Sequence, residues 1–271
     1  MRENTVRKHF SNLRWFLRWA IRKGYCNETA IQRITPKFKE IPPPIIFLTP
    51  EELHRLYNYK IPKNGEMVTL RRLDGEEYNK VVESAAALEK TRDLFCFCAF
   101  TSLRYSDMAK LKRSDIGKDT MSVTTKKTND RLTIDLNDFA KAILKKYGKE
   151  KHPADRALPV ISNQKMNNYL KDLCELCGIS EPVRQDPVKG GIRTEEVRMK
   201  WELVSTKAAR KTFISYAISK GIPPETVMKW TGHSDYKAMK PYLDIAESAK
   251  KEAMDALNEH LQTTLNDGRT D

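Results

Sequence analysis

The sequence has no long apolar run. No stretch approaches the roughly 18 apolar residues that a helix needs to cross a bilayer. The first ten residues lack the apolar core that a signal peptide requires. These two absences favour a cytoplasmic protein.

Metal and cofactor motifs are also scarce. Only five cysteines occur, and the CxxC formed by Cys174 and Cys177 falls within a helical pattern. No second CxxC or suitably spaced histidine pair completes a zinc site. A glycine-rich phosphate loop is absent as well. We therefore predict structural thiols in a reducing compartment, and neither a metal nor an organic cofactor.

What the chain does have is basic charge. Lys and Arg number 49 against 36 Asp and Glu, which gives a formal net charge of +13 over 271 residues. A surplus of this size on an ordinary globular composition favours a polyanionic partner, and nucleic acid is the commonest one. Charge alone leaves open a merely soluble basic protein.

The N-terminal part is predicted to be separate from the rest. Apolar residues at three- and four-residue steps predict a helix over 4–33, with Gly24 as a natural stop. The proline cluster that follows is incompatible with a helix and predicts a linker over 41–48. A segment of about 40 residues is at or below the size that folds alone. We therefore expect residues 1–40 to be the end of a larger helical domain and residues 49–271 to form a second domain.

The second domain is predicted to be mainly helical. Thr49 followed by Pro50 predicts a helix start, and the polar stretch 58–75 predicts a loop or small hairpin. Residues 121–136 alternate with a period of two around a turn, which predicts the one convincing hairpin, and 183–201 predicts an exposed ribbon or loop. The expected helices cover 77–100, 137–148, 162–178, 206–220, 224–231 and about 236–261. The predicted fold class is therefore mainly α with a small antiparallel β-sheet (α+β).

Five short motifs follow one another along this domain. Arg104 lies in T101-S-L-R-Y-S-D107, and Lys127 opens the second strand of the predicted hairpin. Arg210 ends S205-T-K-A-A-R210, His233 lies in T231-G-H233, and Tyr242 comes nine residues after that histidine. In this order and spacing the motifs resemble the catalytic domain of tyrosine recombinases, the phage-integrase family. The segments F97-C-A-F-T-S-L-R-Y-S-D-M-A-K-L111 and W201-E-L-V-S-T206 look most like integrases of Bacteroides-type mobile elements.

Phosphoryl transfer has a use for each of these side chains. Arg104 and Arg210 carry permanently charged forks that match two oxygens of a phosphodiester. The resemblance implies that Tyr242 is the nucleophile, and a cationic surrounding would favour its phenolate. His233 follows a predicted helix end and can hydrogen-bond the same phosphate.

Three lysines and one aspartate complete the predicted site. Lys127 can protonate the departing 5′ oxygen, and Lys126 competes for this role. Asp107, one turn beyond Arg104, can orient an arginine fork from behind. At Lys207 the sequence departs from the family pattern, which usually has histidine there. An ordinary lysine donates to a phosphate oxygen but accepts a proton less readily at neutral pH, because it titrates near ~10.4 against ~6.5 for histidine.

The resemblance implies a site-specific DNA recombinase, an integrase that cuts and rejoins DNA through a 3′-phosphotyrosyl intermediate. It also implies a tyrosine-recombinase catalytic domain preceded by a partial core-binding segment, and a homotetramer on double-stranded DNA at the bacterial nucleoid. The DNA would be gripped mainly through its phosphates. Candidate contacts lie on the N-terminal helix, the hairpin and the ribbon: Arg7, Lys8, Arg14, Arg18, Lys126 and Arg193.

Two other interpretations stay open. Residues 217–236 resemble a helix-turn-helix with Gly221 in the turn, as in a basic transcription regulator. Such a regulator leaves Arg104, the hairpin lysine and the tyrosine spacing unexplained. The second alternative keeps the fold but makes the chain a non-catalytic DNA-binding relic, with Lys207 as the sign of decay. Covalent attachment to DNA separates the recombinase from both.

Overall fold

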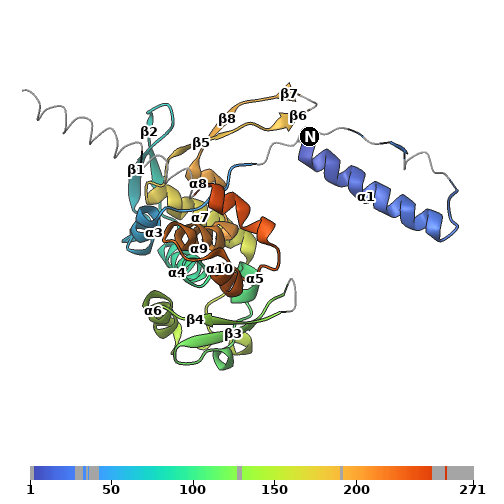
Figure 1. Cartoon of the computed structure of the whole chain (residues 1–271). Helices are drawn as coiled ribbons and strands as arrows, with labels where there is room; N and C mark the ends of the chain where they lie inside the picture. The colour runs from blue at the N-terminus through green and yellow to red at the C-terminus, as the bar shows by residue number, and fades with distance from the viewer. Residues whose placement is uncertain are drawn as a thin grey trace, which may run out of the picture. The chain divides into compact units, whose positions relative to one another are not determined.

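The computed structural model describes residues 3–27, 33–34, 36, 43–126, 130–189, 192–245 and 254 (Figure 1). The chain divides into two compact units, one of Met1–Pro44 with Glu181–Met199 and one of Ile45–Ser180 with Lys200–Asp271. The first break falls inside the predicted linker. The grouping of the later segment with the N-terminal one is not foreseen by the predicted division.

The described part of the first unit includes helix α1 and a β-ribbon. Helix α1 (Glu3–Arg22) ends well before residue 33, so the predicted helix over 4–33 is too long. Gly24 explains the early end, because its φ of 75° turns the chain out of the helix. In the ribbon, β5 (Pro182–Gln185) pairs with β8 (Glu196–Met199), and β6 (Val188–Lys189) pairs with β7 (Ile192–Arg193), all antiparallel.

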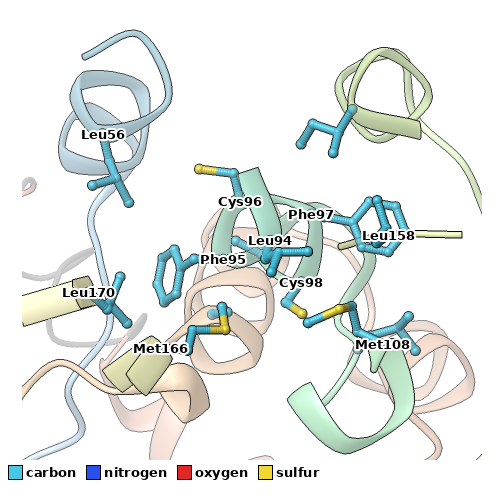
Figure 2. Packing of buried hydrophobic residues seen from close by; sticks show 14 of the residues in the cluster. Leu56, Leu94, Phe95, Cys96, Phe97, Cys98, Met108, Leu158, Met166 and Leu170 are labelled. Atoms are coloured by element: carbon cyan, nitrogen blue, oxygen red, sulfur yellow. The ribbon is translucent and has the colours of Figure 1, made fainter. Parts of the chain in front are cut away.

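The second unit is built around helix α4 (Ala85–Thr101), whose last two turns are almost entirely apolar and buried. Helices α6 (Asp138–Tyr147), α7 (Asn163–Leu176) and α9 (Thr206–Ser219) lie against α4. Figure 2 shows Phe95 and Phe97 projecting to opposite sides of α4, Phe95 toward Leu170 and Phe97 toward Leu158. Since the last two turns of α4 are apolar on all sides, they are stable only at the centre of the unit.

The cysteines take part in this core. Cys96, Cys98, Cys174 and Cys177 are free thiols and are buried. Burial raises the pKa of the Cys177 thiol to about 12, so this thiol stays protonated and unreactive at neutral pH. The packing agrees with the predicted structural role.

Shorter helices complete the second unit. Helix α3 (Pro50–Tyr57) begins at the predicted point, where Thr49 and Glu52 form a capping box, and it is followed along the chain by α5 (Tyr105–Met108), α8 (Lys200–Leu203) and α10 (Pro224–Thr231). Three 3₁₀ turns cover Arg113–Asp115, Pro153–Asp155 and Tyr236–Ala238. The helix predicted over 236–261 is present at 240–245, and beyond 245 only residue 254 is described. No helix among the described residues is both long and apolar enough to cross a membrane.

Two hairpins belong to the second unit, although the sequence predicts only one with conviction. The predicted hairpin is formed by β3 (Thr120–Thr124) and β4 (Arg131–Asp135). The other is formed by β1 (Met67–Arg71) and β2 (Glu77–Val81), so the prediction of helix from residue 77 is wrong. Tertiary contacts explain the error: Tyr78 donates to Glu175 of α7, and Lys80 forms ion pairs with Asp172 and Glu175.

A buried ion pair joins the two points at which the chain enters the second unit. The Lys200 ammonium lies 2.7 Å from Oε2 of Glu52, and both side chains are nearly inaccessible to solvent. The same Glu52 oxygen accepts the Thr49 amide at 2.8 Å. The N-terminus of α3 and the start of α8 are therefore held by one carboxylate.

Replacing Lys200 by methionine should destabilise the protein by about 3 kcal/mol, because Glu52 would keep a buried charge without its partner. The matched control is Arg71→Met, which removes an ion pair with Glu77 in which both side chains are more than half exposed. That change should cost less than ~1 kcal/mol. Urea denaturation of the wild type and the two variants measures both effects. Equal losses in the free energy of unfolding would show that the buried ion pair stabilises the protein no more than the exposed one.

Candidate active site

The loop after α4 brings Arg104 to the site. Thr101 ends the helix, and Ser102 adopts a left-handed conformation with φ of 61°. The Ser102 hydroxyl donates to the carbonyl of Trp230 at 3.1 Å, which fixes this unusual turn against the end of α10. Arg104 then occupies the N-cap position of α5.

Asp107 lies behind Arg104, as the sequence predicts. Its carboxylate is buried and stands 3.8 Å from Nη1 of Arg104. It also accepts the backbone amide of Lys126 at 2.9 Å. One carboxylate therefore ties the first arginine to the end of strand β3.

Arg210 is the central side chain of the site. It is buried on α9, where its Nη1 donates to the Ser102 carbonyl at 3.2 Å and its Nη2 donates to the Thr231 carbonyl. The same Nη2 lies 3.2 Å from Nε2 of His233. The guanidinium thus connects three segments that are far apart in the sequence.

The N-terminus of α9 is anchored by neighbouring side chains. The backbone amide of Thr206 donates to Asn167, and its hydroxyl donates to Asn163, both at 2.9 Å. Ser205 occupies the N-cap position but makes no capping hydrogen bond with its side chain. The two asparagines of α7 therefore fix the start of the helix that carries Arg210.

His233 is positioned by the end of α10. Gly232 has φ of 62°, and a Cβ at this residue would lie 2.8 Å from the Leu132 side chain of β4. The turn places Nδ1 of His233 at 2.9 Å from the Thr231 hydroxyl. Both ring nitrogens therefore have partners, one on α10 and one on α9.

Tyr242 borders the site from the C-terminal side. It lies against a small apolar cluster that includes Ile214, Val227 and Met239. Burial raises the pKa of the Tyr242 hydroxyl, and the nearby charge of Arg210 acts in the opposite direction but does not outweigh it. The phenol is therefore protonated at neutral pH in the free protein, and the cationic surrounding predicted from sequence lowers its pKa only in part.

Two positive charges are crowded together in the same place. Burial first, and then the charge of Arg104, lowers the pKa of Arg210 to about 10. Nη1 of Arg104 is itself buried and has no hydrogen-bond partner among the described residues. A bound anion would supply the hydrogen bond that this buried donor lacks and would offset the charge of the second guanidinium.

Comparison with known proteins decides the family. The model of the phage integrase family matches residues 71–249, about two thirds of the chain. The chain belongs to the phage integrase family. No curated protein matches it in sequence.

Three solved structures of integrases and recombinases share the fold. A lambda integrase dimer bound to a COC′ core site is 17% identical with a TM-score of 0.60, over 89% of this chain and 59% of that one. The XerH recombinase bound to a palindromic difH substrate is 16% identical with a TM-score of 0.52, over 78% and 52%. The Tn1549 transposon integrase in complex with circular intermediate DNA is 13% identical with a TM-score of 0.52, over 89% and 75%. This integrase-family chain thus spans only somewhat more than half of the first two.

The structure brings most of the predicted catalytic residues of this integrase-family chain together. Arg104, Asp107, Arg210 and His233 form one connected group, and Tyr242 lies within electrostatic reach of Arg210. Lys207 is exposed on the first turn of α9 and is not hydrogen-bonded to any member of that group in the described structure. Lys127 lies outside the described residues.

The residues predicted to bind DNA lie in both units. Lys126 lies two residues beyond β3 in the second unit, where its backbone amide donates to Asp107. In the first unit, Arg193 of β7 forms an ion pair with Asp186 of the ribbon. The other four are on α1: Arg7, Lys8, Arg14 and Arg18.

Two residues of the site are missed by the sequence reasoning. Ser102 and Thr231 supply the carbonyls that hold Arg210, and their hydroxyls bind Trp230 and His233. One signal in the sequence points to both: each lies at the predicted end of a helix and close to a motif residue. Their side chains carry no charge, so a search for titratable groups passes over them.

Replacing Gly232 by alanine should displace His233 and destabilise the protein by about 2 kcal/mol. Positive φ alone costs about 1 kcal/mol for an alanine, and the contact with Leu132 adds to it. Gly221→Ala is the matched control, because Gly221 has φ of 77° and nothing within 4 Å of the added Cβ. Thermal or urea unfolding measures the difference. Equal losses for both glycines would show that the Leu132 contact does not constrain the turn.

Proposed function

We propose that this chain is a site-specific DNA recombinase, an integrase that cuts and rejoins double-stranded DNA through a 3′-phosphotyrosyl intermediate. The observation that carries the proposal is the group formed by Arg104, Arg210 and His233 beside Tyr242. Nη1 of Arg104 supports it, because this buried atom makes no hydrogen bond among the described residues and a phosphodiester oxygen is a suitable acceptor for it.

In the proposed reaction, the oxygen of Tyr242 attacks the scissile phosphorus while the 5′ oxygen leaves. Arg104 and Arg210 neutralise the charge that gathers on the equatorial oxygens of the transition state. Loss of one such donor from a site of this kind costs on the order of 3 kcal/mol, or about two decades in rate. The ester keeps the energy of the broken bond, so a second 5′-hydroxyl can reverse the step on another strand.

Two protons have to move in this step. The phenol of Tyr242 must give its proton to solvent, and a phosphate anion bound to the arginines does not itself favour the phenolate. Arg210 is the cation already acting on Tyr242, so its position matters for the nucleophile as well as for the phosphate. We assign protonation of the leaving 5′ oxygen to Lys127, with Lys126 as the competing candidate. Lys207 contributes an exposed positive charge on the first turn of α9.

The proposed partner is double-stranded DNA, and the proposed working form is a homotetramer on it. Lambda integrase is seen as a dimer on a core site and as a tetramer on a Holliday junction. The net charge of +13 agrees with binding to a polyanion. The basic residues of α1 and of the ribbon would contribute contacts to phosphates, and the exchange of strands between two duplexes requires more than one active site.

A covalent trap tests the proposal. The protein is incubated with supercoiled plasmid and a panel of nicked duplexes, and the products are separated under denaturing conditions. The wild type should give a protein–DNA adduct, and Tyr242→Phe should abolish it. Tyr236→Phe is the control, because this exposed tyrosine lies six residues earlier and outside the cluster. Arg104→Met should lower the adduct yield about a hundredfold.

If the adduct survives in Tyr242→Phe and disappears in Tyr236→Phe, the nucleophile is Tyr236 and the proposed role of Tyr242 is wrong. Salt-sensitive binding to every duplex of the panel without any adduct would favour the relic or the regulator. A duplex from the excised junction of the element that encodes the protein serves as the matched substrate, so that a missing target site does not decide the result.

A further inference from the structure

Thr231 has contacts that the proposed reaction does not use. It is the last residue of α10 and is completely buried. Its hydroxyl lies 2.8 Å from the carbonyl of Val227 and 2.9 Å from Nδ1 of His233. Its own carbonyl accepts from Arg210. Thr231 therefore contacts two of the side chains that would meet the phosphate, Arg210 and His233.

The proton on His233 can be placed from its two neighbours. An arginine guanidinium is always a donor, so the 3.2 Å contact with Nη2 of Arg210 requires Nε2 of His233 to accept. The ring proton must then be on Nδ1, where it is donated to the Thr231 hydroxyl oxygen. The hydroxyl hydrogen of Thr231 is donated in turn to the Val227 carbonyl. All four groups are satisfied by this arrangement and by no other neutral form of the ring.

The resting arrangement has a consequence for phosphate binding. With its proton on Nδ1, His233 presents a lone pair to Arg210 and occupies a donor that a phosphate oxygen would need. If Nε2 of His233 and a phosphate oxygen both accepted the hydrogen of Nη2 of Arg210, each hydrogen bond would be weaker. The lone pair on Nε2 would also repel the phosphate oxygen. His233 can donate to the phosphate only after its proton has moved to Nε2.

We infer that Thr231 is a positioning residue that holds His233 in the Nδ1–H tautomer in the free protein and allows it to change to the Nε2–H tautomer when an anion binds Arg210. A hydroxyl can serve both states, because it accepts from Nδ1–H in one and donates to Nδ1 in the other. In the change, Nδ1 gives its proton to water and Nε2 takes one from water, so the ring charge is unaltered. The second half of this inference rests on the proposed function, and the first half does not.

Nitrogen-15 NMR of the histidine side chains tests the inference on the full chain without any reaction. The chain has five histidines, and His233→Gln identifies the signal of interest. Wild type and Thr231→Ser should both show the Nδ1–H form of His233. Thr231→Val, which keeps the shape but loses the hydroxyl, should shift the signal toward the Nε2–H form.

Thr101→Val is the matched control. Thr101 is also a completely buried last residue of a helix, its hydroxyl donates to the carbonyl four residues earlier at 2.7 Å, and the next residue has positive φ. Removing this hydroxyl should leave the His233 tautomer as in the wild type. A change of equal size in both valine variants would reduce Thr231 to a general structural role and overturn the inference.

Addition of inorganic phosphate tests the second half. In the wild type and in Thr231→Ser, saturating phosphate should move His233 from the Nδ1–H to the Nε2–H signature. A wild-type protein that shows Nε2–H before phosphate is added would overturn the inference, even if Thr231→Val does not fold. A tautomer that stays at Nδ1–H with phosphate bound would overturn the change of state. The covalent trap does not depend on the His233 tautomer before or after phosphate is added. A failure of the recombinase proposal can therefore be distinguished from a failure of this inference.

Discussion

The buried guanidinium of Arg210 is the constraint on which the rest of the site depends. It is held by the carbonyls of Ser102 and Thr231 and by Nε2 of His233. These contacts come from the end of α4, the end of α10 and the residue beyond α10, so the guanidinium joins helix ends that share no sequence neighbourhood. Both helices end in a residue with positive φ, and this common geometry is what turns their last carbonyls toward one point.

Such an arrangement is costly in the absence of a ligand. The charge of Arg210 is taken out of water and lies near Arg104, and both effects lower the pKa of Arg210. The fold supplies neutral acceptors rather than a carboxylate, and Asp107 is engaged with Arg104 and the amide of Lys126. A site with two cations and one buried carboxylate keeps a net positive charge, and an anion stabilises it by completing the balance. The crowded positive charges lower the stability of the free protein, and a bound anion raises it again. Such a loss of stability is common at functional sites.

The sequence predicts most helices of this fold well, but it predicts poorly the features that depend on tertiary contacts. Helix α10 has the predicted bounds, because Pro224 and Gly232 mark its two ends locally. For the β1–β2 hairpin the sequence predicts a loop or small hairpin over 58–75 but wrongly assigns strand β2 to a helix, since this polar strand is stabilised by ion pairs with α7 that no local pattern encodes. The positions of the charged motif residues follow from resemblance and order. The uncharged supports at residues 102 and 231 lie at helix ends close to motif residues, but their contacts with Arg210 could not be predicted, because these contacts are made by backbone carbonyls whose direction depends on the folded turns.

The most direct test of this account is whether the two arginines form an anion site before any DNA is present. Thermal unfolding is followed as chloride is replaced by sulfate at constant ionic strength, in the wild type, in Arg104→Met and in the exposed control Arg71→Met. The account predicts that sulfate raises the Tm of the wild type and of Arg71→Met by more than that of Arg104→Met, because binding to the native state adds to the general effect of the salt. An identical dependence on sulfate in all three proteins would contradict it.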